Sequence, residues 1–326
     1  MGSLQGKTVL ITGGGNGVGA QTARELRKRG ANLVLTDIDQ KALDAIVAEL
    51  GGDSALGIVA DVTNLESMQA AVAQATERFG GLDVVMANAG IATYGTVLNV
   101  DPAAFYRLID INVNGVFNTV RAALPSIIDR QGYVLVVSSL AAYAVAPSLA
   151  AYGTSKAGVE NFANALRLEI SHLGVDVGSA HMSWIDTPMV RDAKSDLPAF
   201  KEMLRRMPPP LGKTTTIDKC GTAFAKGIEK RKRRVFCPGW VRWLRLGNLL
   251  AHMGAALTLY FLVRRLLLDL DKRPAPGLGA TAAATAPGRR RGSPAGRSSG
   301  RRRARRASVA ARARRRRAGP APGAGR

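Results

Sequence analysis

Short apolar runs alternate with longer stretches of helical periodicity through residues 8–180. The runs are rich in β-branched residues, and they are apolar along almost their whole length. This indicates strands buried on both faces of a parallel sheet, and right-handed crossovers then predict a doubly wound α/β fold. We expect strands at 8–12, 32–36, 56–60, 82–87, 133–138 and 175–180, and helices at 18–29, 40–50, 65–79, 103–109, 113–128 and 152–172.

The alternation stops near residue 186. Residues 187–216 contain prolines at 188, 198, 208, 209 and 210 around two short helical patterns. A long insertion of this kind is more often functional than idle, so we expect a mobile cover over the site. A last helix at 219–229 and a last strand at 235–237 follow. The expected catalytic domain therefore spans residues 1–240.

The C-terminal part differs in composition. Residues 274–326 contain 15 arginines but no lysine and no acid, so +15 of the formal net charge of +22 lies there. This tail of Arg, Ala, Pro and Gly should be disordered, and its arginine clusters would bind polyanions non-specifically by counterion release. A merely solvated tail is the alternative.

An apolar and basic helical segment is expected at 241–273. Within it, residues 246–263 carry no Asp, Glu, Lys or Arg, and 18 residues is the lower limit for a membrane span. A span, a helix lying on a membrane surface and a helix packed on the body or a partner all stay open. Cys220 and Cys237 are expected to be isolated reduced thiols, and no secretory signal is visible. We expect a cytoplasmic protein, with membrane association left open.

A glycine-rich turn, Thr12-Gly13-Gly14-Gly15-Asn16-Gly17-Val18-Gly19, joins the first strand to the first helix. Such a turn lets the backbone approach a pyrophosphate at a helix N-terminus. Asp37, at the end of the second strand, would accept hydrogen bonds from ribose hydroxyls and repel a 2′-phosphate. No arginine directly follows it. We therefore expect a dinucleotide cofactor, NAD in preference to NADP; a helix N-cap is the alternative role for Asp37.

Tyr152 and Lys156 are spaced i and i+4, so they project from one face of a helix. A phenol is a poor base at neutral pH, but a nearby ammonium lowers its pKa and brings it into range for proton transfer. Ser139, at a strand end, can hydrogen-bond a substrate oxygen. No metal site is expected.

These motifs, taken in order, resemble those of the single-domain short-chain dehydrogenase/reductase family. TGxxxGxG, Asp61-Val62, Asn88-Ala89-Gly90, Asn112, Ser139 and YxxxK fall at the family spacings over about residues 5–240. The resemblance implies a Rossmann fold in one domain. It also implies a cofactor site built from Thr12, Gly13, Asn16, Gly17, Val18, Gly19, Asp37, Asp61, Val62, Asn88, Ala89, Gly90, Tyr152, Lys156, Ile185 and Thr187.

The resemblance also implies catalytic roles. Tyr152 would be the acid/base, and Lys156 would hold the nicotinamide ribose while lowering the tyrosine pKa. Ser139 would orient the substrate oxygen, and Asn112 would hold the water of a proton relay. From the residues alone, Asn112 could instead cap a helix, and Asp61 could begin an Asx turn.

Within the cofactor set, Asp61 and Val62 would hold the adenine, and Thr187 would contact the nicotinamide carboxamide. One departure from the family pattern affects this last assignment. Met182-Ser183 stands where the family usually has Pro-Gly, so the backbone leading to Thr187 must take a different route. His181 and Trp184 could face the substrate or simply pack.

The substrate pocket should be apolar. Its expected walls are Ala141, Tyr143, Val145, Leu149, Met182, Trp184 and Met189, with residues 192–207 as a lid. We expect an NAD(P)-dependent oxidoreductase that interconverts a hydrophobic secondary alcohol and its ketone, in a homo-oligomer. The alternatives are a non-catalytic dinucleotide-binding scaffold and polyanion binding by the tail.

Overall fold

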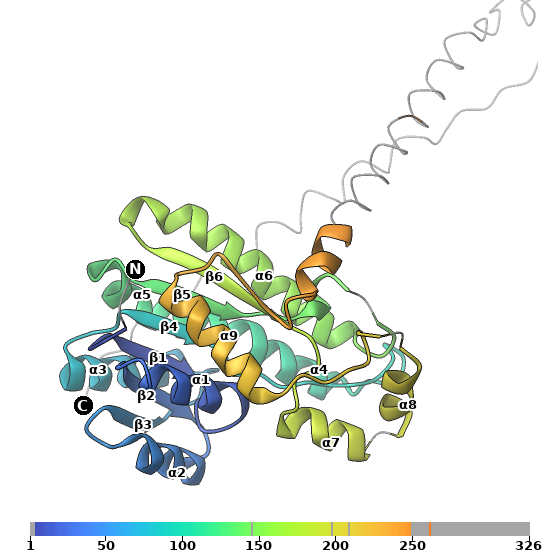
Figure 1. The fold of residues 1–326 in the computed structure, drawn as a ribbon, viewed down its shortest axis with the longest axis horizontal. Helices are drawn as coiled ribbons and strands as arrows, with labels where there is room; N and C mark the ends of the chain where they lie inside the picture. Colours follow the sequence, from blue (N-terminus) through green and yellow to red (C-terminus); the bar gives the residue numbers. More distant parts are fainter. Residues whose placement is uncertain (1–3, 145, 197, 208, 249–260, 262–326) are drawn as a thin grey trace, which may run out of the picture. The chain divides into compact units, whose positions relative to one another are not determined.

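The computed structural model describes residues 4–144, 146–196, 198–207, 209–248 and 261. In these ranges the centre is a sheet of seven parallel strands in the order β3-β2-β1-β4-β5-β6-β7 (Figure 1). The strands are β1 (Thr8–Thr12), β2 (Asn32–Asp37), β3 (Ala55–Val59), β4 (Val84–Ala87), β5 (Tyr133–Val137), β6 (Asp176–Met182) and β7 (Arg234–Cys237). The expected doubly wound Rossmann fold is confirmed.

Helices cover both faces of this sheet (Figure 1). They are α1 (Gly17–Arg27), α2 (Gln40–Leu50), α3 (Leu65–Phe79), α4 (Pro102–Ile109), α5 (Gly115–Asp129), α6 (Ala150–Ile170), α7 (Pro188–Asp196), α8 (Pro198–Arg206) and α9 (Ile217–Glu229). Shorter turns lie at η1 (Asp110–Asn114), η2 (Leu140–Ala142) and η3 (Ser171–Leu173).

Each strand buries both of its faces, as the apolar runs predict. Val9 and Ile11 of β1 lie in the core shared with α1, α2 and α9, whereas Leu10 lies in the core shared with α3, α5 and α6. All three side chains have no exposed surface. Successive residues of a strand point to opposite faces, so one apolar run supplies two hydrophobic layers.

Several boundaries differ by one or two residues from those expected, and two of these differences have a clear structural reason. Strand β6 ends at Met182 rather than at residue 180, because Met182 pairs with Cys237 of the edge strand β7. The helix expected at 113–128 begins at Gly115, because the π-helical turn η1 continues α4 directly into α5. The carboxyl ends of all the strands lie at one edge of the sheet, and the order reverses between β1 and β4, which is where ligands bind in such folds.

The expected cover is present as α7 and α8, which form a small core of their own. Val190, Ala193, Phe200 and Leu204 are buried together, with Tyr94 and Trp184 packed against them. Cys220 and Cys237 are free and buried, but they are not isolated, because the two thiols lie near enough to shift each other's pKa, that of Cys220 upward and that of Cys237 downward.

Most of the segment 241–273 and all of the tail 274–326 lie outside the described residues. In the part of the chain that the structure describes, no helix is long and apolar enough to cross a membrane.

Candidate active site

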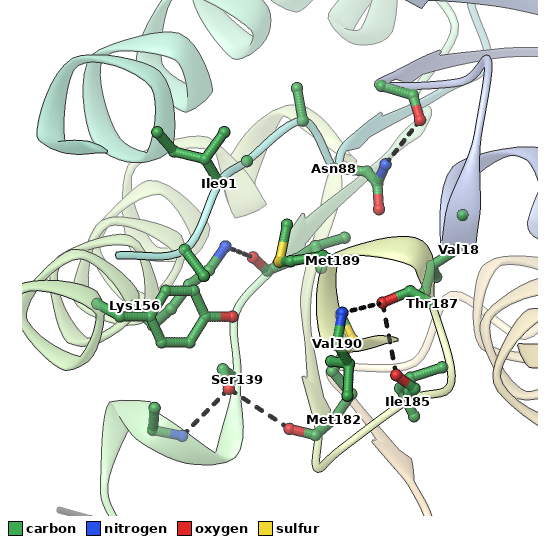
Figure 2. Close-up of a pocket in the computed structure, with 18 of the residues that line it drawn as sticks. Val18, Asn88, Ile91, Ser139, Lys156, Met182, Ile185, Thr187, Met189 and Val190 are labelled. Atoms are coloured by element: carbon green, nitrogen blue, oxygen red, sulfur yellow. Dashed lines mark hydrogen bonds between the residues drawn. The ribbon is translucent and has the colours of Figure 1, made fainter. Parts of the chain in front are cut away.

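A pocket of about 800 Å³ opens at the carboxyl edge of the sheet (Figure 2). It is lined by the glycine-rich turn, by the ends of β2, β4, β5 and β6, by the start of α6, and by the first turn of α7. Of the residues predicted from sequence, it brings together Gly13, Asn16, Gly17, Val18, Asp37, Asp61, Val62, Asn88, Ala89, Gly90, Ser139, Tyr152, Lys156, Ile185 and Thr187.

The glycine-rich turn needs glycine for two separate reasons. Gly13 and Gly17 have φ values of +62° and +57°, which L side chains rarely adopt. A Cβ at Gly19 would overlap the carbonyl oxygen of Gly13, so α1 can pack this close to the turn only if residue 19 lacks a side chain. Gly19 therefore shapes the turn without lining the pocket.

The turn is tied to β4 by Asn88 and Thr12. The Asn88 side-chain amide donates to the carbonyl oxygens of Thr12 at 2.8 Å and Gly13 at 3.1 Å. In return, the Thr12 hydroxyl accepts hydrogen bonds from the backbone N–H groups of Asn88 and Ala89. Thr12 does not line the pocket; it fixes the two segments that do.

Asp37 binds the turn rather than capping a helix. Its Oδ2 accepts a hydrogen bond from the Gly15 N–H at 3.0 Å, and its Oδ1 accepts one from Ile38 at 2.8 Å. The N-cap of α2 is Asp39, which accepts a hydrogen bond from Ala42. The carboxylate of Asp37 therefore stands beside the pocket at the point where an adenosine ribose would meet it.

The Asx-turn alternative for Asp61 is confirmed. Its Oδ1 accepts hydrogen bonds from the Thr63 backbone N–H at 2.9 Å and from the Thr63 hydroxyl at 2.8 Å. Both Asp61 and Val62 also line the pocket, so the turn and the predicted adenine contact are compatible.

Tyr152 and Lys156 reach the pocket from one face of α6, as predicted. Lys156 Nζ donates to the Val137 carbonyl at 3.0 Å and lies 5.7 Å from the centroid of the Tyr152 ring (Figure 2). Burial lowers the pKa of Lys156 to about 8.

The expected lowering of the Tyr152 pKa by Lys156 is wrong for this structure. Burial raises the pKa of the Tyr152 phenol, and hydrogen bonding to Ser139 opposes this with a smaller effect. The reason is that the phenol is desolvated, whereas the ammonium is held by a backbone carbonyl. Tyr152 is therefore protonated at neutral pH.

Ser139 is the serine that faces the pocket, as its spacing predicted. Its hydroxyl donates to the Met182 carbonyl at 3.4 Å and accepts from the Ala141 N–H at 3.2 Å (Figure 2). The neighbouring Ser138 is fully buried and donates instead to the Lys156 carbonyl.

Asn112 is neither a pocket residue nor a helix cap. It lies in the π-helical turn η1 with no exposed surface. Its amide donates to the carbonyl oxygen of Ile91 and to the Ser155 hydroxyl, and its oxygen accepts the Ile91 N–H at 2.8 Å. The side chain therefore fixes the loop after β4 to α6, and its place in a water relay stays a prediction.

Thr187 reaches the pocket despite the missing Pro-Gly pair. The Ser183 N–H donates to the Cys237 carbonyl, and the segment then pairs with Thr215 through Trp184 and Asp186. This route brings the Thr187 side chain beside Gly17, with Ile185 also lining the pocket (Figure 2).

The lining residues at the end of the pocket expected to bind the substrate agree with the predicted wall residues, except at Tyr143. Ala141, Leu149, Met182, Trp184 and Met189 line the pocket, and Val145 lies outside the described residues. Tyr143 does not line it: its ring contacts the fully buried His181, with 5.5 Å between centroids. His181 therefore packs, whereas Trp184 packs against Phe200 and also lines the pocket.

Sequence reasoning missed several pocket residues. Tyr94 follows β4 in the chain, Arg107 and Asp110 belong to α4 and η1, and Leu244 lies beyond β7. The position of Tyr94, just after the end of a central parallel strand, was a usable signal. Of the expected lid 192–207 only Met207 lines the pocket, since α8 packs behind Tyr94 and Trp184.

The family model of short chain dehydrogenases matches residues 7–198. The chain belongs to the short-chain dehydrogenase family. It is 37% identical to the oxidoreductase UcpA of Salmonella typhimurium over 218 aligned residues. The aligned segment covers 64% of this chain and 82% of UcpA. It is also 37% identical over 196 residues to trans-4-hydroxycyclohexanecarboxylate dehydrogenase of Sinomonas cyclohexanicum, covering 58% and 76% of the two chains.

Solved structures of short-chain dehydrogenases share the fold. The 3-ketoacyl-(acyl-carrier-protein) reductase from Brucella melitensis, complexed with NADH, superposes with a TM-score of 0.63 at 29% identity, over 69% of this chain and 92% of that one. Levodione reductase gives 0.66 at 27% identity, over 73% and 98%. This short-chain dehydrogenase is thus an NAD(P)-dependent oxidoreductase acting on CH–OH groups. The side-chain-free cradle at Gly13, Gly17 and Gly19 fits a dinucleotide pyrophosphate.

Proposed function

We propose that this short-chain dehydrogenase interconverts a hydrophobic secondary alcohol and its ketone, with Tyr152 as the proton donor and acceptor. The observation that carries the proposal is the convergence of Tyr152, Ser139 and Lys156 on one apolar pocket beside the glycine-rich turn. Tyr152, the acid, and Lys156, the buried ammonium, lie on α6. Ser139, the orienting hydroxyl, lies at the end of β5.

The residues divide the work as follows. Ser139 holds the substrate oxygen, and Tyr152 gives its phenolic proton to that oxygen in the reducing direction or takes it in the oxidising direction. The raised pKa of Tyr152 suits the reducing direction, because the proton is present at neutral pH. Lys156, whose Nζ donates to the Val137 carbonyl, would hold the nicotinamide ribose. A bound nicotinamide supplies or accepts the hydride.

The preferred cofactor is NAD. Asp37 places a carboxylate at the end of β2 on the pocket wall, and the next residue, Ile38, is 69% exposed and carries no charge. A 2′-phosphate there would meet a negative charge with no adjacent cation, whereas ribose hydroxyls would find a hydrogen-bond acceptor.

The hydrophobic substrate is supported by the wall composition. Ala141, Leu149, Met182 and Met189 surround the pocket beyond Ser139. The domain boundaries, a homo-oligomeric state, a cytoplasmic location, membrane contact of 246–263 and polyanion binding by the tail stay predictions from the sequence.

The test is a panel of hydrophobic ketones and alcohols assayed by nicotinamide absorbance with NAD and NADP side by side. Tyr152→Phe should lower kcat by about 10²- to 10⁴-fold, the usual contribution of one acid/base group. Dinucleotide affinity, measured by calorimetry, should stay within a few-fold. Tyr106→Phe, at a 69% exposed tyrosine on α4, is the matched control. Equal activity of Tyr152→Phe and the parent would contradict the proposal.

A further inference from the structure

A second tyrosine, Tyr94, lines the same pocket. It lies in the loop after β4. The loop is fixed to the substrate-side segment before α6, because the Gly95 N–H donates to the Ser148 carbonyl at 3.0 Å. Tyr94 has no place in the proton transfer proposed above, so its presence in a mostly apolar wall asks for a separate explanation.

The ring of Tyr94 is held by the cover. Its centroid lies 5.2 Å from that of Phe200 on α8, and Phe200 in turn lies 5.1 Å from the ring of Trp184. These rings pack with Val190 and Leu204 into the small core of the cover. The Tyr94 ring is therefore held in place by packing against the cover.

The hydroxyl itself is open. Among the described residues the Tyr94 hydroxyl has no hydrogen-bond partner, and its oxygen is not fully buried. It lies near enough to Tyr152 for the two phenols to interact electrostatically, although they are not hydrogen-bonded to each other. Burial is the main reason why the pKa of Tyr94 rises to about 12, so the group is a neutral donor at any physiological pH.

The surroundings decide what this donor can bind. Ala92, Ala144, Leu149 and Met207 present only apolar side chains to the pocket, and Arg107, which also lines it, is exposed on α4. Lys156 is buried and donates to a backbone carbonyl, so it would stabilise a negatively charged substrate group only weakly. A buried carboxylate would lose its hydration for one neutral hydrogen bond, whereas a hydroxyl or carbonyl loses far less.

We propose that Tyr94 is a specificity-determining residue that hydrogen-bonds a second, neutral oxygen of the substrate. The substrate is then a compact compound with the reacting alcohol or ketone at one end and a hydroxyl or carbonyl group a few carbons away. This inference rests on the proposed function, because the reacting end must lie at Ser139 and Tyr152.

A matched pair of ketones tests it. 4-Hydroxycyclohexanone and 4-methylcyclohexanone have nearly the same size, but only the first carries the second oxygen. The parent enzyme should reduce the hydroxy ketone with a KM about tenfold lower, the effect of one net hydrogen bond. Tyr94→Phe keeps the ring and its packing. It should raise the KM for the hydroxy ketone about tenfold and leave both kcat values, and the KM for the methyl ketone, unchanged.

Tyr106→Phe is the control and should change neither substrate. A Tyr94→Phe enzyme that alters both ketones alike, or a parent enzyme without the preference, would overturn the role of Tyr94 while the proposed function stands. Failure of the parent to turn over any ketone or alcohol, despite binding the dinucleotide, would overturn the proposed function and this inference together.

Discussion

The two ends of the pocket are built in different ways. At the cofactor end, the side chains of Asn88 and Asp37 hydrogen-bond to backbone groups of the turn, and the Thr12 hydroxyl accepts hydrogen bonds from the backbone after β4. At the substrate end, α7 and α8 are held by packing around Phe200, and the ion pairs of Glu202 with Arg205 and Arg206 are exposed and contribute little. The contrast is between a hydrogen-bonded frame around the glycine-rich turn and a separately packed cover of α7 and α8. Under the proposed function, the frame would fix the chemistry and the cover the choice of substrate.

After Tyr152, the largest effect is expected at Ser139. If the frame carries the chemistry, Ser139→Ala should lower kcat by about 10²- to 10³-fold, as the loss of one donor to a developing oxyanion does. Steady-state kinetics with a fixed ketone measure it. Ser138→Ala removes the adjacent, buried serine and should leave kcat within a few-fold. Similar losses in the two variants would show that Ser139 acts only on structure.

Cofactor choice should change next. In the double variant Asp37→Ser with Ile38→Arg, the repelling carboxylate is lost and a cation is gained. The ratio of kcat/KM for NADPH to that for NADH should rise by about 100-fold. Asp39→Ala, which removes the adjacent helix cap, should leave the ratio unchanged. An unchanged ratio in the double variant would contradict the role given to Asp37.

Gly19→Ala tests the close packing of the turn. Because a Cβ there would overlap the Gly13 carbonyl oxygen, the turn must move, and the Kd for dinucleotide should rise about tenfold, equivalent to about 1.4 kcal/mol. Calorimetry measures the Kd. Gly52→Ala is the control, since a Cβ at that position meets nothing within 4 Å. Retained affinity in Gly19→Ala would show that the turn is not the cofactor cradle.

The cover should respond differently from the frame. Phe200→Ala removes the ring that joins Tyr94 to Trp184, so KM for a bulky ketone should rise several-fold while kcat changes little. Phe79→Ala, on α3 far from the pocket, controls for a general loss of stability. A fall in kcat with unchanged KM would place α8 in the frame rather than in the cover.

A separate effect concerns the pH dependence of stability rather than catalysis. Burial lowers the pKa of His181 to about 4, although the negative charge of Glu160 acts in the opposite direction. The folded protein therefore binds a proton at His181 less readily than the unfolded chain does. The free energy of unfolding should therefore keep its full value above about pH 6.5. It should fall by up to about 3 kcal/mol as the pH is lowered toward about 4. Denaturant titrations between pH 4 and 7 should show a steeper loss in the parent than in His181→Phe. Parallel pH profiles would contradict the assignment.

Much of the fold and the cofactor end follows from the sequence alone. The apolar runs specify strands buried on both faces, and a parallel sheet brings every strand's carboxyl end to one edge. Residues that directly follow strands, such as Asp37, Asn88 and Ser139, were therefore predictable as pocket residues. So was the pair of Tyr152 and Lys156, because helical periodicity alone places i and i+4 on one face.

Tertiary structure decided what depends on neighbours distant in the chain. Tyr143 turns to His181, and Tyr94 turns to the cover, although both follow central strands. The pKa of Tyr152 rises because burial outweighs its hydrogen bond with Ser139, a balance set by the packing of several elements around one phenol. Local periodicity determines which face a residue lies on. The desolvation and ring contacts of that residue are determined only when distant parts of the chain pack around it.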